Sequence, residues 1–192
     1  MLWQRQSIIS KPATLPPKAV VTYSTSTPDE SPPPKASEYK VAADQPKTII
    51  IPSLNIEAYI QKVGVDQHGD VSVPSNINFA GWFVNSVKPG ENGLSLVDGH
   101  VGGRYNKGAF KDLIKLQIGS QVNIEYGDGS LRKFEVTDKR ELAADKAAPF
   151  LFEKQKDINA QLNLITCSGD FDKKTNTFNK RTIVVSKRIT SS

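Results

Sequence analysis

Glycine and proline divide the 192-residue chain into two unlike parts. All thirteen glycines lie at Gly64 or later, whereas eight of the twelve prolines lie at or before Pro46. Because proline removes backbone donors and the intervening Ser, Thr and Lys bury little apolar surface, residues 1–46 are predicted to be a flexible tail and linker. Residues 47–192 have an ordinary composition and a length that suits one domain. The first part is then either a disordered leader or a spacer that holds the domain off a surface.

The second part has the pattern of a mainly β fold. Short β-prone runs separated by turn residues cover 48–51, 58–63, 71–73, 93–99, 121–126, 131–137, 161–166 and 181–189. Residues 127–129, Gly-Asp-Gly, give a hairpin signal between two of these runs. One helix is expected from residues near helical spacing that are followed by a glycine, namely Phe110, Leu113, Ile114, Leu116 and Gly119. A second short helix, interrupted by Pro149, is expected over 143–152. Seven or eight short strands predict a barrel or a sandwich.

Composition excludes several classes of function. The net charge is +5, from 25 basic and 20 acidic residues, and the basic residues are scattered, so nucleic acid is not an expected partner. One cysteine excludes an intramolecular disulfide framework and a Cys-based zinc cluster, and two histidines exclude a His-rich metal site. No run approaches the ~18 apolar residues that a membrane-spanning helix needs, so the sequence as given is predicted to be soluble.

The single cysteine, Cys167, is the first candidate for chemistry. A lone cysteine is most often a small buried hydrophobe. Here strand alternation places Cys167 on the face of Asn163 and Ile165, with Thr166 on the opposite face, and a polar loop over 168–180 is predicted to follow at once. A thiol at the mouth of a barrel is better placed for nucleophilic attack than for packing.

A cysteine nucleophile needs a base or a cationic neighbour, because the thiolate is the reactive form. His100 follows the apolar strand 93–99 and is the candidate base, whereas His68 lies in a predicted turn and is interpreted as a solvated loop residue. Arg181 is predicted to open the last strand, and its guanidinium can present forked donors to a developing oxyanion. Each residue alone is a weak signal, since most such arginines face water.

Taken together, these residues resemble the sortases, the cysteine transpeptidases of the bacterial cell surface. The resemblance runs from about Thr48 to Ile189, and the sequence is most similar overall to the single-domain sortases of class E and F type. Its motifs are Asn163-Leu164-Ile165-Thr166-Cys167, Gly99-His100, Arg181-Thr182-Ile183-Val184-Val185, Ile51-Pro52-Ser53-Leu54-Asn55-Ile56, Val73-Pro74, Gly81-Trp82-Phe83, Pro89-Gly90-Glu91-Asn92-Gly93 and Gly108-Ala109-Phe110. Asn163 stands where the family usually has threonine. The resemblance implies a closed β-barrel of seven to eight strands with one or two short helices.

The resemblance also implies an activity. Cys167 would attack the Thr–Gly bond of a Leu-Pro-x-Thr-Gly-like sorting signal, and Arg181 would steady the oxyanion or orient the peptide. His100 would protonate the departing amine and later deprotonate an incoming amine of a peptidoglycan precursor or cross-bridge. Thr166 and residues 168–180 are candidates for lining the peptide groove.

The resemblance further implies a setting and a cofactor requirement. The expected setting is the extracytoplasmic face of the membrane or the cell wall of a Gram-positive-type bacterium, with the enzyme a monomer. No cofactor is expected. Some sortases bind calcium, but Glu91 is the only carboxylate shortly upstream of Asp98, and no acidic cluster is apparent.

Other readings remain open from the residues themselves. A caspase-like enzyme would need a different local signature around Cys167, and a papain-like enzyme would place cysteine before histidine. An L,D-transpeptidase would carry a histidine next to its cysteine. A non-enzymatic surface β-barrel with an inert thiol would lose no function in Cys167→Ala.

Overall fold

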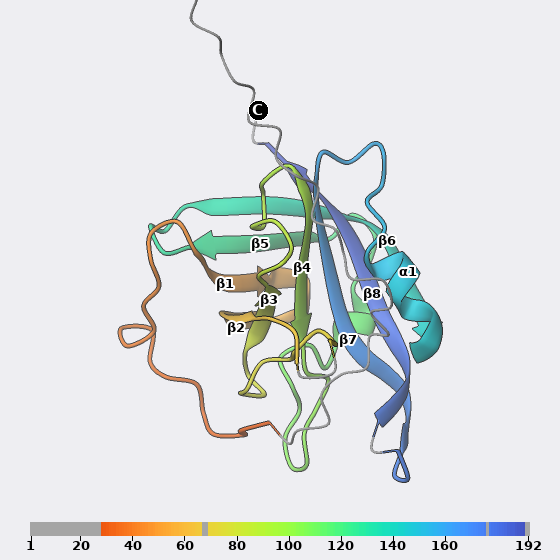
Figure 1. The fold of residues 1–192 in the computed structure, drawn as a ribbon. Coiled ribbons are helices and arrows are strands. Elements are labelled where there is room, and N and C mark those ends of the chain that lie inside the picture. Colours follow the sequence, from red (N-terminus) through yellow and green to blue (C-terminus); the bar gives the residue numbers. More distant parts are fainter. Residues whose placement is uncertain (1–27, 67–68, 176, 191–192) are drawn as a thin grey trace, which may run out of the picture.

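Eight β-strands close into a barrel in the computed structural model, which describes residues 28–66, 69–175 and 177–190 (Figure 1). The strands are β1 Pro46–Ile51, β2 Ile56–Val63, β3 Ala80–Phe83, β4 Gly93–Gly99, β5 Gln121–Tyr126, β6 Leu131–Ala143, β7 Ala160–Asp172 and β8 Thr177–Ile189. They follow one another around the barrel in the order β1-β2-β3-β4-β7-β8-β6-β5. The pairs β2–β3 and β4–β7 are parallel and the others antiparallel. The prediction of a mainly β, closed barrel with seven to eight strands is confirmed.

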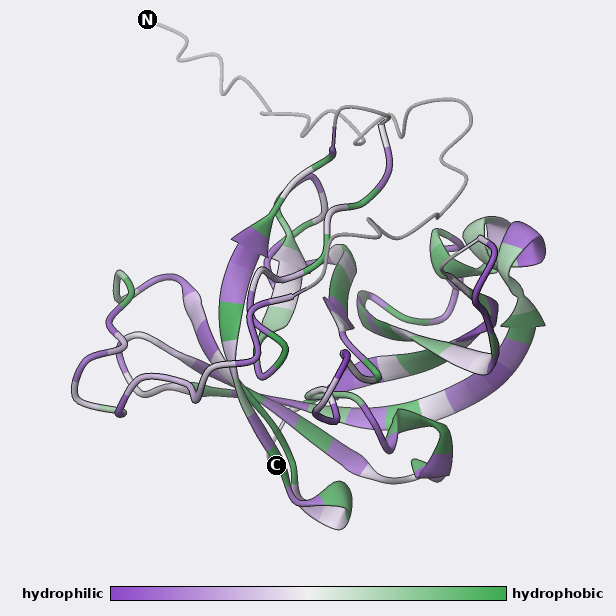
Figure 2. Cartoon of the chain, turned by 90° about the horizontal axis from the view of Figure 1, so that it is seen from below, coloured by the Kyte–Doolittle hydropathy of each residue, from purple (hydrophilic) through white to green (hydrophobic). Residues whose placement is uncertain are grey.

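Two apolar layers hold the barrel together, one inside it and one on its outer face. Strand alternation sends Val97, Leu162 and Leu164 into the interior, where they pack with the side chains of β1, β2, β5 and β6. The opposite faces of β4, β7 and β8 carry Leu96 and Ile165 into a second cluster beneath α1, which spans Ala147–Leu151. Figure 2 shows the resulting green and purple bands along the strands. The outer layer matters for function, because Cys167 lies on the same face as Ile165.

The prediction of a helix over residues 110–116 is wrong. The second predicted helix is present, but α1 continues through Pro149 instead of being interrupted there. Only a 3-10 turn, η2 Leu113–Lys115, forms there. Phe110, Leu113 and Leu116 are fully buried, whereas Ile114 is 38% exposed. Burial at every third residue matches the three-residue turn of a 3-10 helix rather than the α-helical period. Over 143–152 the chain forms η3 Ala144–Lys146 followed directly by α1.

The last two strands are longer than the sequence indicated, and residues 168–180 are mostly a hairpin rather than a loop. β7 continues past Cys167 to Asp172, with a register shift between Ser168 and Phe171, and β8 begins at Thr177. Gly169 has a φ of 78° at this irregularity, a left-handed conformation that glycine adopts readily. The expectation that Cys167 and Arg181 sit at strand ends is therefore wrong: they pair inside the β7–β8 ladder.

Two smaller expectations also fail. The predicted strand over 71–73 is a single bridge between Val65 and Val71, and β3, with its one glycine and two aromatics, was not predicted.

Residues 28–45 run along the outside of the barrel and make specific contacts with it (the orange trace in Figure 1). Tyr39 stacks on Tyr59 of β2 with ring centroids 4.3 Å apart, and its hydroxyl donates to the Ile60 carbonyl at 2.6 Å. Asp44 pairs with Lys88 at 2.6 Å. The predicted linker role of residues 1–46 stays a prediction, because residues 1–27 lie outside the described part of the chain, as does His68.

Candidate active site

Strand register pairs two of the predicted residues on the outer face of the barrel, and the third directly follows the neighbouring strand. Cys167 of β7 is the direct partner of Arg181 of β8. On the other side of β7, Asp98 of β4 pairs with Ile165, two residues before Cys167. His100 follows Asp98 by two residues, so the same register carries it to the level of Cys167. We call Cys167 of β7, Arg181 of β8 and His100, which directly follows β4, the row; continuing the β4–β7 register past Asp98 is what assigns His100 to it.

Cys167 is partly exposed, and its surroundings act on the thiol in opposite directions. Burial raises the pKa of Cys167 above its ordinary value, the positive charge of Arg181 lowers this pKa, and Asp98 raises it. Burial prevails, so the neutral thiol is the main resting form at neutral pH. The thiolate that chemistry needs is a minor species in the free protein.

The His100 imidazole is held from a neighbouring loop. Its Nε2 lies 2.7 Å from the carbonyl oxygen of Pro74. A carbonyl can only accept, so Nε2 carries a proton and Nδ1 is the nitrogen that can gain or lose one. Burial lowers the pKa of His100, and the hydrogen bond to Pro74 raises it by a smaller amount. The backbone of His100 is also closely packed, because a Cβ added at Gly108 would overlap the His100 carbonyl.

Arg181 is the largest fully buried side chain among the described residues, with 1% exposure. Its Nη1 donates to the carbonyl oxygens of Phe178 and Lys180, both at 2.8 Å. A guanidinium does not lose its charge when buried, so β8 places a permanent positive charge beside the Cys167 thiol. Such a charge can stabilise a thiolate or an oxyanion that forms at this position.

Asp98 is a fourth group near the row that the sequence did not single out as functional. It is 1% exposed, and neither carboxyl oxygen has a hydrogen-bond partner among the described residues. A Cβ added at Gly81, its partner on β3, would overlap Oδ1. Burial raises the pKa of Asp98 well above its ordinary value; the nearby Gly81 backbone N–H, which forms no hydrogen bond of regular geometry with the carboxylate, lowers this pKa by less. The only signal in the sequence was one acid in an otherwise apolar run.

Thr166 and Asn163 have contacts that differ from a groove-lining role. Thr166 points into the barrel, is 2% exposed, and donates from Oγ1 to the Gly99 carbonyl at 2.7 Å. This bond fastens β7 to β4 directly before His100. Asn163 donates from Nδ2 to the Leu151 carbonyl at 2.6 Å and so ties β7 to the end of α1. The hairpin residues 168–172 are largely exposed and are the part of the predicted groove wall that faces solvent.

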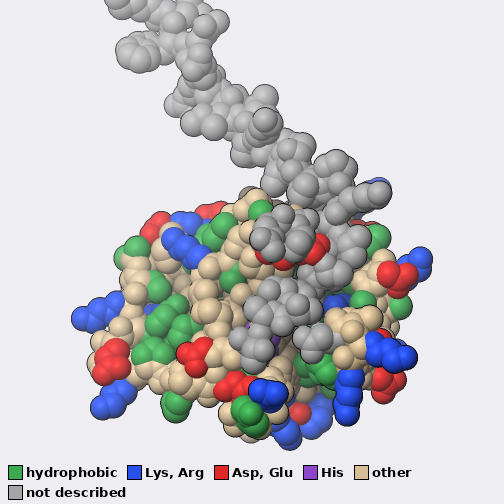
Figure 3. Space-filling view, turned by 60° about the horizontal axis from the view of Figure 1, so that its bottom comes forward, with side chains coloured by type: hydrophobic (Ala, Val, Ile, Leu, Met, Phe, Trp, Pro, Cys, Tyr) green, Lys and Arg blue, Asp and Glu red, His purple; other side chains and the backbone are tan. Residues whose placement is uncertain are grey.

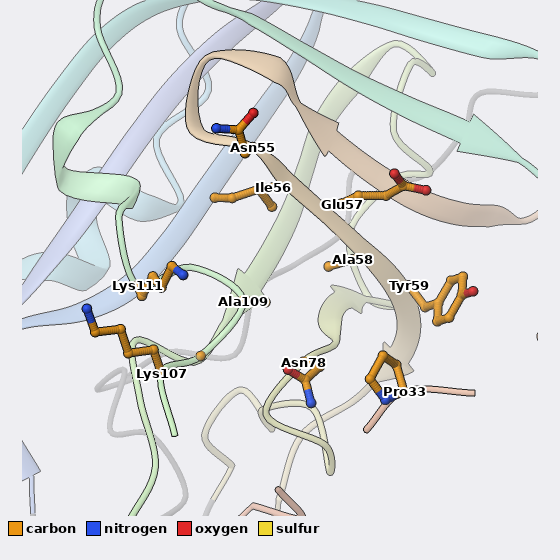
Figure 4. A pocket seen from close by; sticks show the side chains of 11 residues that line it. Pro33, Asn55, Ile56, Glu57, Ala58, Tyr59, Asn78, Lys107, Ala109 and Lys111 are labelled. Atoms are coloured by element: carbon orange, nitrogen blue, oxygen red, sulfur yellow. The ribbon is translucent and has the colours of Figure 1, made fainter. Parts of the chain in front are cut away.

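A separate pocket of about 450 Å³ lies against the outside of β2. Figure 4 shows Lys107 and Lys111 on one side of it, and Tyr59 and Pro33 on the other. It contains none of the three residues of the row, although Gly108 lines it and lies against His100.

On the face turned forward in Figure 3, basic and acidic side chains are interspersed around the rim and form no patch of one sign.

Residues 28–66, 69–175 and 177–190 contain neither a cluster of metal ligands nor a membrane-spanning helix. No group of three or more His, Cys, Asp or Glu in these ranges could hold a metal ion. Nor does any helix there have the length and apolarity to cross a bilayer.

Comparison with known proteins gives one consistent result. Residues 49–189 match the sequence model of the sortase domain. The fold is similar to sortase A from Corynebacterium diphtheriae (lid mutant), with a TM-score of 0.60, 19% identity, and coverage of 81% of this chain and 76% of that one. It is also similar to sortase C1 from Streptococcus agalactiae, with a TM-score of 0.58, 21% identity, and coverage of 81% and 72%. Sortase D5 from Clostridium perfringens gives a TM-score of 0.55, 22% identity, and coverage of 80% and 84%. A search of curated proteins gives no match.

Proposed function

Because the chain belongs to the sortase family of cysteine transpeptidases, we propose that Cys167, His100 and Arg181 are its catalytic residues. The observation that supports this proposal is the direct pairing of Cys167 with Arg181, together with His100 at the end of β4, the strand on the other side of β7. A nucleophile, an acid–base group and a fixed positive charge are the groups that acyl transfer through a thioester requires.

The first half of the reaction forms an acyl-enzyme. The Cys167 thiolate attacks the carbonyl carbon of a peptide bond, and the oxygen gains negative charge beside the Arg181 guanidinium. When the tetrahedral intermediate collapses, the C–N bond breaks and the His100 imidazolium gives its Nδ1 proton to the leaving amine. The products are a thioester on Cys167 and a free amine.

The second half transfers the acyl group to an acceptor. His100, now neutral, takes a proton from an incoming amine as its nitrogen attacks the thioester carbonyl. The C–S bond breaks and Cys167 leaves as the thiolate, so the starting charge state is restored. Water in place of the amine gives hydrolysis, so the ratio of the two products measures how well the site selects its acceptor.

Protonation sets how much enzyme can react. The pKa of Cys167 is raised and that of His100 is lowered, so the resting pair is a neutral thiol and a neutral imidazole. The reactive pair of thiolate and imidazolium is a minor protonation state. It is most populated between the two pKa values, which predicts a bell-shaped pH dependence.

The proposed substrate is a sorting signal resembling Leu-Pro-x-Thr-Gly, cleaved between Thr and Gly. The proposed acceptor is an amine of a peptidoglycan precursor or cross-bridge. The enzyme would then act at the extracytoplasmic face of the membrane or in the cell wall, the setting in which the family works.

The direct test incubates the protein with Leu-Pro-x-Thr-Gly-type peptides and an amine, and follows products and intact protein mass. We expect an amine-ligated product and a mass increase on Cys167 equal to the acyl fragment. Cys167→Ala should abolish both, with a loss of activity of at least about 10³-fold. Cleavage that persists in Cys167→Ala would refute the proposed nucleophile. A library screen in which no peptide leaves an adduct would refute the transpeptidase proposal.

A further inference from the structure

Glu30 makes an unusually complete set of contacts with the loop that follows His100. Its Oε1 accepts from the Arg104 backbone N–H at 2.6 Å, and its Oε2 accepts from the Asn106 backbone N–H at 2.8 Å. The Tyr105 N–H lies 3.2 and 3.1 Å from the two oxygens, and Asn106 Nδ2 donates to Oε2 at 2.9 Å. A Cβ added at Gly103 would overlap Oε1, so the loop is shaped around the carboxylate.

This loop is closed on itself at the His100 end. The Gly108 N–H donates to the Val101 carbonyl at 3.0 Å, and the Phe110 N–H donates to the His100 carbonyl at 2.9 Å. The Gly103 N–H donates to the Asn106 carbonyl at 2.8 Å. Residues 104–106 at the tip of the loop, which bind Glu30, are thus connected to the backbone of His100 by a short ladder of hydrogen bonds.

The residues beside Glu30 bind the other loop that controls His100. Asp29 donates its N–H to the Ser75 carbonyl and accepts from the Ile77 N–H, both at 2.8 Å. The Ser31 carbonyl accepts from the side-chain amides of Asn76 and Asn78, both at 3.1 Å. Ser75 directly follows Pro74, whose carbonyl holds the His100 imidazole. Residues 29–31 therefore join two loops that are otherwise far apart in the sequence.

We propose that Glu30 is a positioning residue for the transfer reaction, which holds these two loops together and so fixes the His100 imidazole between them. The inference rests on the proposed function, because it takes His100 as the acid–base group. Hydrogen bonds between a carboxylate and several converging backbone N–H groups are strong for their size and set a loop in one geometry. Proton transfer depends on such geometry to within a fraction of an ångström.

The chemistry of the contact is that of a carboxylate seated in an anion-binding loop. Burial alone would raise the pKa of Glu30, but the N–H groups of Tyr105, Arg104 and Asn106 together lower it, so the carboxylate is the bound form. Removing the side chain leaves three or four N–H donors pointing at one place. A small free carboxylate such as acetate can occupy that place without restoring the chain connection to Asp29 and Ser31.

The experiment compares Glu30→Ala and Glu30→Gln with the wild-type full-length chain. The matched control is Glu38→Ala, in the same segment, where the one hydrogen bond of the carboxylate within the described part of the chain is from the nearby Lys35 N–H, at 3.3 Å. The measurements are kcat and KM for peptide transfer with and without acetate, and amide hydrogen exchange at Gly108 and Phe110. Neither of these amides touches Glu30, so their exchange reports on the His100 backbone rather than on the lost contact itself.

We expect kcat to fall about 10-fold in Glu30→Ala, with KM changed by less than about twofold. Acetate should restore part of the rate lost in Glu30→Ala. The kcat of Glu30→Gln should lie between those of Glu30→Ala and wild type, and the kcat of Glu38→Ala should equal that of wild type. Exchange at Gly108 and Phe110 should quicken by about the same factor. Wild-type rates and wild-type exchange in Glu30→Ala would overturn the inference. A loss of rate that only follows a loss of global stability, without acetate rescue, would also overturn it.

The exchange measurement separates this inference from the proposed function. If the wild-type protein transfers no peptide, the catalytic proposal fails, yet faster exchange at Gly108 and Phe110 in Glu30→Ala still establishes that Glu30 holds the His100 backbone. If transfer is normal and exchange at the two amides is unchanged, the catalytic proposal stands and the positioning role of Glu30 is refuted.

Discussion

The two ends of the catalytic row are positioned by different kinds of structure. Cys167 and Arg181 lie inside the long β7–β8 ladder, where backbone register alone fixes them opposite each other. His100 lies just beyond β4, and its imidazole depends on a carbonyl from residue 74. Its backbone depends on the close approach of Gly108. The nucleophile and the positive charge are thus set by the sheet, and the acid–base group is set by loops.

This difference predicts that the two ends fail in different ways. A change at the sheet end should remove a chemical group and leave the geometry in place. A change at the loop end should disturb geometry while every catalytic group is still present.

After loss of the nucleophile itself in Cys167→Ala, the next largest effect is expected in Arg181→Lys, also at the sheet end. A lysine ammonium cannot donate to the Phe178 and Lys180 carbonyls while also spreading a fork toward an oxyanion, so kcat should fall by about 10²–10³-fold. Unfolding by denaturant should show a native-like cooperative transition. The matched control is Arg140→Lys on β6, where the arginine is an exposed partner of Asp138 at 3.1 Å and activity should be unchanged. Full activity in Arg181→Lys would show that the arginine only packs.

A smaller effect with a different character is expected at the loop end, in Gly108→Ala. The new Cβ would overlap the His100 carbonyl, so the loop must shift. We expect kcat to fall by about 10-fold or more and the free energy of unfolding to fall by about 1–3 kcal/mol. Gly64→Ala is the control, because a Cβ there has open space. If Gly108→Ala is as active as Gly64→Ala, the loop does not set the position of His100.

The mildest effect concerns Asp98, which sits below the row and belongs to the sheet. Its pKa is raised in the folded state, so the folded protein holds a proton that the unfolded chain releases above the ordinary value of 3.8. The free energy of unfolding of the wild type should therefore fall as pH rises from 3.8 toward the raised pKa of Asp98. Asp98→Asn should lack that fall. The two stability curves should diverge as pH rises above 3.8, which denaturant unfolding at several pH values measures.

The control for Asp98→Asn is Asp145→Asn, which removes an exposed carboxylate on η3. This variant should follow the wild-type curve. Parallel curves for wild type and Asp98→Asn would mean that Asp98 has the same pKa in the folded and the unfolded protein, which contradicts the raised pKa.

The sheet end of the site could be predicted from the sequence because it depends on local pattern. Alternation with a period of two placed Thr166 and Cys167 on opposite faces, and the structure has Thr166 inside and Cys167 with the outer layer. The same local pattern failed beyond Cys167. Residues 168–172 are polar apart from Phe171, because the β7–β8 hairpin extends past the barrel into solvent, so no apolar alternation marked them as a strand.

At the loop end His100 itself was predicted, but the contacts that hold it were not, because they join distant parts of the chain through backbone atoms. The Pro74 carbonyl and the N–H groups of residues 104–106 have no side-chain signature. Glu30 lies in a proline-rich stretch whose composition predicts disorder, and its partners are more than 70 residues away. Asp98 stood out only as one acid in an apolar strand, and its burial needed β3 and the neighbouring Gly81 to be known.

The central claim is that a partly buried, neutral thiol and imidazole are the resting form of Cys167 and His100, and that they separate charge only to react. The pH dependence of Cys167 alkylation by iodoacetamide tests it most directly, because only the thiolate reacts. With the pKa of Cys167 raised above its ordinary value of 9.0, the alkylation rate should be slow at neutral pH and keep rising into the alkaline range. A rate that is already high and flat from about pH 6 upward would reveal a permanent thiolate–imidazolium pair and contradict the account.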